Sequence, residues 1–317
     1  NAKEIVLGAT RTFTINDSLA PESDIDLALD VPVSGSATHG ISKAGGGVMS
    51  LGGANTFDGN ISVAAGLLIM NHPQAFGLPS ASRTVTVSKN AMLLLDGSKG
   101  NIDVPANYTT FNIRNAGLPL PQQMRGALIS RNGTNSISAD VTLSDATWIT
   151  VQSGKLVLNG DFINTTVRAL TVFTEGDLEI NGTIGNKAVS TLTKYSGGRL
   201  TMRGSSGHTG VTYIYGGALN VQHNNALGTT AGGTIVYNTA ALELQGNVTI
   251  GNEALTIVGL GPDNDGALRS VSGTNTYGGT VTLSTRDCRI NCDSGLLKLA
   301  PATGNSVAST ALNVILG

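Results

Sequence analysis

Few residues of this sequence could do acid–base or nucleophilic chemistry, and they are not grouped. The 317 residues include four histidines, His39, His72, His208 and His223. His72 and His223 occupy matching positions in two copies of a long internal repeat. Duplication of the repeat is enough to explain this match. No serine, histidine and aspartate are spaced as a nucleophile with its base, and no pair of carboxylates stands out. We therefore predict no catalytic residues and no enzyme, and we interpret the histidines as structural.

One acidic turn has the composition of a cation site. PDNDG (Pro262–Gly266) places Asp263 and Asp265 two residues apart before a glycine, and Ca²⁺ prefers several oxygen ligands. The glutamate that closes an EF-hand loop is absent, and so is a calcium-binding nonapeptide. Turns rich in Asp and Asn also form without a metal. We predict no metal site and no cofactor.

Aromatic residues are the strongest candidates for binding, although they make up only 4% of the chain. Trp148 lies between Thr147 and Ile149. Because Ile149 is expected to point inward, Trp148 should point outward or lie along a corner. Tyr213 and Tyr215 share one face of a strand and predict a short outer aromatic stripe. Exposed rings of this kind anchor sugar rings or protein partners, whereas a tryptophan that lies flat on its neighbouring strand is structural.

The two cysteines, Cys288 and Cys292, are too few for a disulfide scaffold. Four residues of extended strand separate them by about 13 Å, whereas a disulfide needs Cα atoms within about 7 Å. If Arg286–Asp293 is a regular strand, both remain thiols on the same face as Ile290. A bridge across a bend is the alternative.

Composition excludes several classes of protein. Charged residues make up only 13% of the chain and the net charge is −2, without a basic cluster, so we expect no nucleic-acid partner. Hydrophobic residues make up 40%, which is enough for a core and argues against disorder. No apolar run approaches the 18–20 or so residues of a spanning helix, so we expect no membrane span in this segment.

Apolar residues alternate with polar ones almost everywhere, as in Val85/Val87, Leu93/Leu95 and Val141/Leu143. Turns rich in Gly, Asn, Asp and Ser separate these short runs. No dozen residues sustain a period of 3.6, so we expect almost no helix. The sequence predicts many short strands, as in a sandwich, a propeller, a barrel or a solenoid.

A long internal repeat distinguishes between these architectures. Lys43–Gly59 (KAGGGVMSLGGANTFDG) is echoed 151 residues later by Lys194–Gly210 (KYSGGRLTMRGSSGHTG). Gly126–Ser144 matches Gly266–Ser284 at an offset of 140. The change in offset means that some coils differ in length. A solenoid tolerates this difference because each coil contacts only its neighbours.

We therefore predict an all-β fold, a parallel β-helix of roughly 14 coils of about 20–24 residues each. Its expected organisation is a leading set of coils at 1–39, a first repeat block at 40–190 and a second block at 191–317, continuous with the first. The low content of charged residues agrees with this fold. In a parallel β-helix, like charges at equivalent positions would stack about 4.8 Å apart and repel one another.

The repeat resembles a known family. GISKAGGGVMSLGGANTFDG (Gly40–Gly59) is similar to the autotransporter-associated β-strand repeat of bacterial surface proteins. Leu192–Gly210 resembles it with departures, since Ser206–Gly207 replace the expected Ala/Ser-Asn pair and His208 lies near the aromatic position. Ser272–Leu283 matches its second half. The resemblance implies a right-handed parallel β-helix outside the cell, and it brings no shared catalytic residues.

Both ends of the sequence begin or stop within a strand-like run, RTFTINDS near Asn1 and LNVILG at Leu312–Gly317. Solenoids normally cover their terminal coils. The expectation is therefore that the chain is a segment of a longer protein or that other subunits complete its ends.

We expect an extracellular, cell-surface β-helix with a structural role as a stalk, fibre or surface-layer component, possible partners being further copies stacked end to end. The alternative is an adhesin or toxin-like passenger that binds a host protein or a glycan through Trp148, Tyr213 and Tyr215. A third hypothesis is a carbohydrate-active enzyme, which would need a groove holding two or three carboxylates. The 19 lysines and arginines are few for such a groove.

Overall fold

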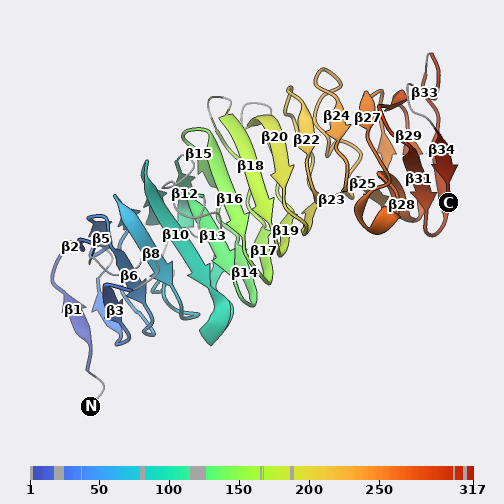
Figure 1. The fold of residues 1–317 in the computed structure, drawn as a ribbon. Helices are drawn as coiled ribbons and strands as arrows, with labels where there is room; N and C mark the ends of the chain where they lie inside the picture. The colour runs from blue at the N-terminus through green and yellow to red at the C-terminus, as the bar shows by residue number, and fades with distance from the viewer. Residues whose placement is uncertain are drawn as a thin grey trace. The chain divides into compact units, whose positions relative to one another are not determined.

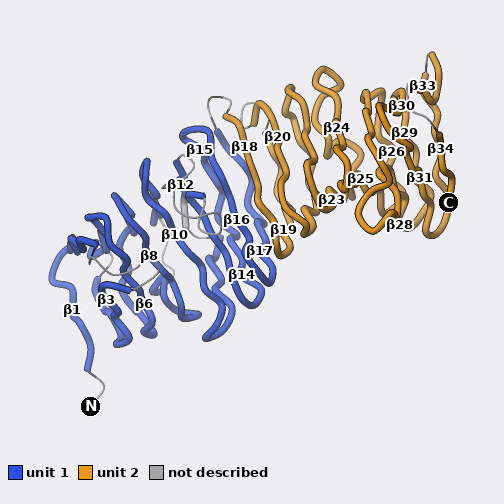
Figure 2. The backbone as a smooth tube through the Cα atoms, in the orientation of Figure 1, with its two compact units in different colours: residues 1–164 blue, residues 165–317 orange. Residues whose placement is uncertain are grey.

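The computed structural model of the chain describes residues 3–17, 25–36, 38–78, 83–106, 108–114, 126–164, 166, 168–185, 189–302, 304–309 and 313–317, with the backbone alone for 108 and 109. It forms two compact units, unit 1 (Asn1–Asn164) and unit 2 (Thr165–Gly317), coloured separately in Figure 2. The described residues are almost entirely strand and turn, and their helices are the two 3-10 turns η1 (Gly97–Lys99) and η2 (Pro262–Asn264).

Unit 1 contains three parallel sheets and one further strand pair among its described residues. The first sheet contains β2 (Arg11–Thr14), β5 (Ile41–Ala44), β7 (Ile61–Val63), β9 (Arg83–Val87), β12 (Tyr108–Ile113) and β15 (Val141–Leu143). The second contains β3 (Leu27–Leu29), β6 (Val48–Leu51), β8 (Gly66–Met70), β10 (Ala91–Asp96), β13 (Leu128–Arg131) and β16 (Thr147–Val151). The third contains β11 (Asp103–Val104), β14 (Thr134–Ile137) and β17 (Lys155–Leu158), and the separate pair is β1 (Ile5–Leu7) with β4 (Val33–Gly35).

Unit 2 also has three parallel sheets among its described residues, and its strands follow one another in chain order (Figure 1). The first sheet contains β18 (Arg168–Thr174), β20 (Val189–Tyr195), β22 (Thr212–Ile214), β24 (Thr234–Val236), β27 (Leu255–Ile257), β30 (Val281–Leu283) and β33 (Val307–Ser309). The second contains β19 (Asp177–Ile180), β21 (Arg199–Met202), β23 (Gly217–Val221), β25 (Ala240–Gln245), β28 (Leu268–Ser272), β31 (Cys288–Cys292) and β34 (Val314–Leu316). The third contains β26 (Thr249–Ile250), β29 (Thr274–Tyr277) and β32 (Leu296–Leu299).

Each strand pairs in parallel with the strand one coil earlier, which stacks equivalent residues in rows. In unit 1 one interior row contains Ile41, Ile61, Val85, Phe111 and Val141. All five side chains are buried. The alternation seen in the sequence thus becomes a core of stacked aliphatic and aromatic side chains, and the predicted parallel β-helix is confirmed.

The number of coils is slightly lower than the predicted 14, since six described strands stack in the second sheet of unit 1 and seven in the first sheet of unit 2. Coil length varies more than the glycine spacing suggested. Ile41 pairs with Ile61, 20 residues on, whereas Leu93 pairs with Leu128, 35 residues on. The stacked strands keep their register although the coils differ in length, so the same length of chain makes fewer turns.

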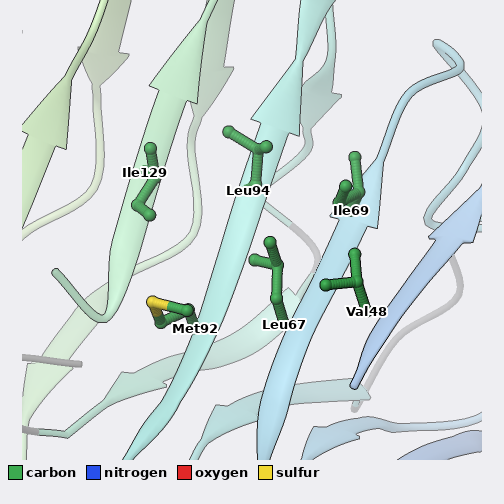
Figure 3. Packing of buried hydrophobic residues seen from close by; sticks show 6 residues of the cluster. All are labelled: Val48, Leu67, Ile69, Met92, Leu94 and Ile129. Atoms are coloured by element: carbon green, nitrogen blue, oxygen red, sulfur yellow. The ribbon is translucent and has the colours of Figure 1, made fainter. Parts of the chain in front are cut away.

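The second sheet of unit 1 carries a second apolar cluster besides the interior rows. Along β10, Leu93 and Leu95 are buried as alternation predicts, but Met92 and Leu94 between them are buried too. Figure 3 shows these two among the six residues of the cluster, which are Val48, Leu67, Ile69, Met92, Leu94 and Ile129. Continuous apolar strands are typical of parallel sheets that are covered on both faces.

The cysteines are thiols, as the strand geometry predicts. Cys288 and Cys292 begin and end β31 and are both free. Cys288 is buried, and its thiol donates to the carbonyl of Ile257 at 3.4 Å.

No helix in the described part of the chain is long and apolar enough to cross a membrane.

The stacked interior row gives a direct test of the fold. Phe111→Ala should lower the free energy of unfolding by about 3–5 kcal/mol, because the ring lies buried between Val85 and Val141 and its loss leaves a cavity. Urea unfolding followed by circular dichroism measures the change. Thr142→Ala, on the partly exposed face of β15, is the control and should stay within about 0.5 kcal/mol of the parent. Equal losses for the two variants would contradict the interior row.

Candidate functional site

The lysine of the repeat motif is a buried corner residue rather than a surface charge. Lys43 and Lys194 are both fully buried. The Nζ of Lys194 donates to the carbonyls of Ser196 at 2.6 Å and Gly216 at 2.7 Å, and so joins the corners of two successive coils. The Nζ of Lys43 donates to Gly45 and Ala65 in the same way, at 2.6 and 3.0 Å. Burial lowers the pKa of Lys194 to about 7, against the opposing charges of Glu175 and Asp177, and that of Lys43 to about 8.

The asparagine of the motif also lies inside. Asn55, Asn135 and Asn275 are fully buried, and the Oδ1 of each accepts an amide N–H from an earlier coil at 2.9 Å. The amide nitrogen of Asn55 donates to Ala75 on the next coil at 2.8 Å. These residues satisfy backbone groups that the corner leaves without a strand partner. The motif therefore encodes the fold, and its conspicuous polar residues are not a binding surface.

A polar cluster lies inside unit 2, where the sequence predicts apolar rows. The inward row Leu192, Thr212, Thr234 and Leu255 includes two buried threonines in register. His208, at the aromatic position of the motif, is buried and contacts Thr212 Oγ1 through Nε2 at 2.8 Å. Burial lowers the pKa of His208 to about 4, so the ring is neutral at neutral pH.

Glu253 is the acidic member of this cluster. It is buried, and its Oε1, the Thr234 hydroxyl and the Tyr277 hydroxyl have no hydrogen-bond partner within normal distance. Burial raises the pKa of Glu253 to about 7, against the stabilising effect of the nearby Thr234 side chain and Gly233 amide. Burial, and then the charge of Glu253, raise the pKa of Tyr277 well above its usual range. The cluster is enclosed, so it bears on stability rather than on surface recognition.

The predicted aromatic stripe is part of a longer ladder on the outside of unit 2. Tyr215 stacks on Tyr195 with ring centroids 4.7 Å apart and on Tyr237 at 4.3 Å, with interplanar angles of 5° and 11°. Phe173 stacks on the other face of Tyr195 at 5.1 Å. Tyr213 lies beside Tyr215 at 6.1 Å. One ring from each of four successive coils thus forms a continuous stack.

Stacking decides which part of each ring a ligand can reach. Tyr195 lies between Phe173 and Tyr215, and Tyr215 lies between Tyr195 and Tyr237, so neither offers a free ring face. Tyr215 is nevertheless 37% exposed, through its edge and hydroxyl. A hydrogen bond to Tyr237, together with burial, raises the pKa of Tyr215 to about 12. The two inner rings of the ladder, Tyr195 and Tyr215, therefore present edges and hydroxyls rather than a flat platform for a sugar.

Trp148 belongs to unit 1. It lies on β16 between the buried residues Thr147 and Ile149 and is itself half-buried, as alternation predicts. Its carbonyl accepts the amide of Ala127 at 3.0 Å. The candidate binding residues therefore divide between the units, with Tyr213 and Tyr215 together in unit 2 and Trp148 in unit 1.

A polar hollow of about 260 Å³ lies in unit 2, on the second sheet. Its small residues come from the corners that follow the ladder tyrosines, since Gly197 and Gly198 follow Tyr195, and Gly217 follows Tyr215. The full lining is Asp177, Gly197, Gly198, Arg199, Gly217, Ala218, Glu243, Pro262, Asp263, Asp265 and Arg269. The lining thus combines four carboxylates and two guanidiniums with small residues, three glycines and one alanine.

Glu243 is the central charge of the hollow and is only 2% exposed. Its Oε1 accepts from Arg199 at 3.0 Å, and its Oε2 accepts from Asn220 at 3.0 Å. Arg269 lies 3.8 Å from the same carboxylate and pairs with Asp293 at 2.7 Å and Asp265 at 3.3 Å. The hydrogen bond to Asp293 raises the pKa of Arg269 above its ordinary range despite its partial burial. These contacts fix both guanidiniums at the rim.

The acidic turn that resembled a calcium site contributes to this hollow. Asp263 and Asp265 line it, and Asp265 pairs with Arg269. Within the described residues, no group of three or more His, Cys, Asp or Glu side chains is placed to hold a metal ion.

The two repeat histidines, His72 and His223, have the same local role. Each accepts a hydrogen bond from a turn amide through Nδ1 at 3.1 Å, from Gln74 and Asn225 respectively.

Sequence reasoning identified only part of this site. It predicted the stripe from Tyr213 and Tyr215 but missed Phe173, Tyr195 and Tyr237. The spacings along the ladder, 22, 20 and 22 residues, equal one coil each and were available as a signal. The charged network had no such signal, because Arg199, Glu243 and Arg269 are unlike one another and meet only through the register of β21, β25 and β28.

Comparisons with known proteins connect part of the chain to a bacterial adhesin. The adhesin BmaC autotransporter of Brucella suis biovar 1 (strain 1330) is 36% identical to the chain over 108 residues. This stretch is 34% of the chain and 3% of the adhesin, so the chain spans a small part of that relative's length. No protein-family model matches the chain, and no solved structure matches it. The similarity fits an autotransporter-like passenger, whereas membership of the β-strand repeat family stays a prediction.

The buried lysine predicts a pH dependence of stability. The pKa of Lys194 is about 7 when folded and 10.5 ordinarily, so between these values the folded protein binds fewer protons than the unfolded chain. Raising the pH should therefore stabilise the fold through this residue. The free energy of unfolding of the parent, relative to Lys194→Met, should rise between about pH 7 and about pH 10.5. Lys298→Met, at an exposed position, is the control, and a flat or falling difference for Lys194 would contradict the burial of its amine.

The buried Glu253 predicts a pH dependence of stability that is opposite in sign to that of Lys194. Its pKa is about 7 when folded and 4.5 ordinarily, so the folded protein binds more protons between these values and loses stability as the pH rises. Glu253→Gln should therefore gain stability relative to the parent between about pH 5 and about pH 8, measured by urea unfolding. Glu4→Gln, exposed in unit 1, should show no such trend. A pH-independent difference for Glu253→Gln would show that its carboxyl titrates normally.

Proposed function

We propose that this chain is a β-helical segment of an adhesin-like passenger protein exposed on a bacterial cell surface. The observation that carries the proposal is the 36% identity to an autotransporter adhesin over 108 residues. The parallel β-helix supports it, because a chain of stacked strands presents side chains and turns along its whole outer surface. The proposal includes a longer parent chain, and it assigns this segment no catalytic role.

The physical chemistry of the units suits an exterior location. Backbone groups are paired from coil to coil, and even the corners are closed by buried Lys and Asn side chains. Local opening that would admit a protease therefore has to break several cross-coil hydrogen bonds together. Within this proposal, a stalk or fibre role differs from an adhesive role only in whether the outer surface binds a ligand.

Surface exposure is the first test. Antibodies raised against the purified 317-residue chain should label intact cells that encode it, and brief protease treatment of intact cells should remove the label. Cells with the coding region deleted are the control. Labelling only after permeabilisation would overturn the proposed location.

Adhesion is the second measurement. Deletion of the coding segment should reduce attachment of the bacteria to cultured host cells, and beads coated with the purified chain should attach where uncoated beads do not. Attachment that is unchanged in both experiments would favour the stalk role. Electron microscopy of the purified chain then checks for filaments formed end to end.

A further inference from the structure

We propose that the polar hollow of unit 2 binds one uncharged sugar residue of a glycan. Its hydrogen-bonding groups are the donors Arg199 and Arg269 and the acceptors Asp177, Asp263 and Asp265, while the buried Glu243 holds the arginines in place. This inference rests on the proposed function, and it names the ligand class of an adhesin. The hollow is a built feature of the second sheet, since a charged side chain that is almost completely buried lines an opening of about 260 Å³.

The lining matches a polyhydroxylated ligand. A sugar hydroxyl both donates and accepts a hydrogen bond, so its site needs donors and acceptors close together. Arg199 and Arg269 offer N–H donors, while Asp177, Asp263 and Asp265 offer carboxylate acceptors around the same opening. A site for an anion would need positive charge to dominate, whereas this lining has four carboxylates against two guanidiniums. The metal alternative lacks a suitable cluster within the described residues.

The polar groups are held in place before a ligand arrives. Asn220, Glu243 and Arg269 occupy one register row across β23, β25 and β28. Both oxygens of Glu243 are hydrogen-bonded, and Arg269 is fixed by Asp293. Preorganised side chains lose little conformational freedom on binding, which favours a small polar ligand.

The net charge of the lining selects against acidic sugars. Asp177, Asp263 and Asp265 are exposed, and with Glu243 they outnumber the two arginines. A sialylated or sulfated sugar would bring a further negative charge into this hollow and be repelled. We therefore expect a neutral hexose or an N-acetylated hexosamine rather than an acidic unit.

Two tyrosines of the aromatic ladder lie close in sequence to glycines that line the hollow. Tyr195 lies two residues before Gly197, and Tyr215 lies two residues before Gly217. Because the faces of these two rings are covered by stacking, they can contribute only edges and hydroxyls to the next sugar unit. The site would thus hold one unit in the hollow and allow the glycan to continue along the tyrosine hydroxyls.

The test uses the purified chain on an array that carries neutral, sialylated and sulfated glycans, followed by titration calorimetry with the neutral oligosaccharide that gives the strongest signal. Ala218→Leu places a larger side chain in the lining of the hollow and should weaken binding by about ten-fold or more. Arg199→Gln removes a donor at the rim and should weaken binding in the same direction. Ala146→Leu, at an exposed position of unit 1, is the matched control and should bind like the parent. Circular dichroism verifies that each variant is folded.

Each outcome decides the proposal. Binding of neutral glycans that Ala218→Leu and Arg199→Gln both weaken supports it. Failure to bind any neutral glycan, binding of acidic glycans alone, or unchanged affinity in both variants overturns it. Should Ala218→Leu fail to fold, Arg199→Gln alone decides. Surface labelling without glycan binding would overturn this inference alone, whereas glycan binding by a protein confined within the cell would overturn only the proposed function.

Discussion

The structure depends on the stacking of each residue on its equivalent one coil earlier, at the spacing of hydrogen-bonded strands, about 4.8 Å. Because of this constraint, side chains at equivalent positions of successive coils form continuous rows. Apolar rows such as Ile41, Ile61, Val85, Phe111 and Val141 form the core. Aromatic residues at equivalent outward positions form a ladder for the same reason. Like charges would repel in such rows, which explains why the chain contains few of them.

The constraint is hardest to meet at the corners of the coils, because the backbone there leaves the hydrogen-bonded strands. The repeat motif answers this need, with Lys43 and Lys194 donating to corner carbonyls and Asn55, Asn135 and Asn275 joining coils. A buried amine is costly unless its hydrogen bonds are complete. The motif's polar residues are thus part of the scaffold, and function has to be sought on residues outside it.

Outside the motif, the same register brings unlike residues together. Glu243 meets Arg199 and Arg269 on the second sheet of unit 2, next to the corners that follow the stacked tyrosines. Scaffold and candidate site therefore share one mechanism: parallel pairing aligns strands whose spacing along the chain is one coil. Variation of a few side chains on such a surface can change its ligand without touching the core.

The sequence by itself determined the fold class and the outward direction of Tyr213 and Tyr215, because period-two alternation is a local property. Strand geometry favoured thiols at Cys288 and Cys292 over a bridge, and the structure decided between the two. It slightly overestimated the number of coils, because a change in coil length, such as the 35 residues from Leu93 to Leu128, leaves no periodic signal in the sequence. It also missed the buried Thr212, Thr234 and Glu253. Only the tertiary structure decided which distant residues are neighbours, since register between coils is set by the packing of whole rows. The charged hollow and the full aromatic ladder exist only through that register.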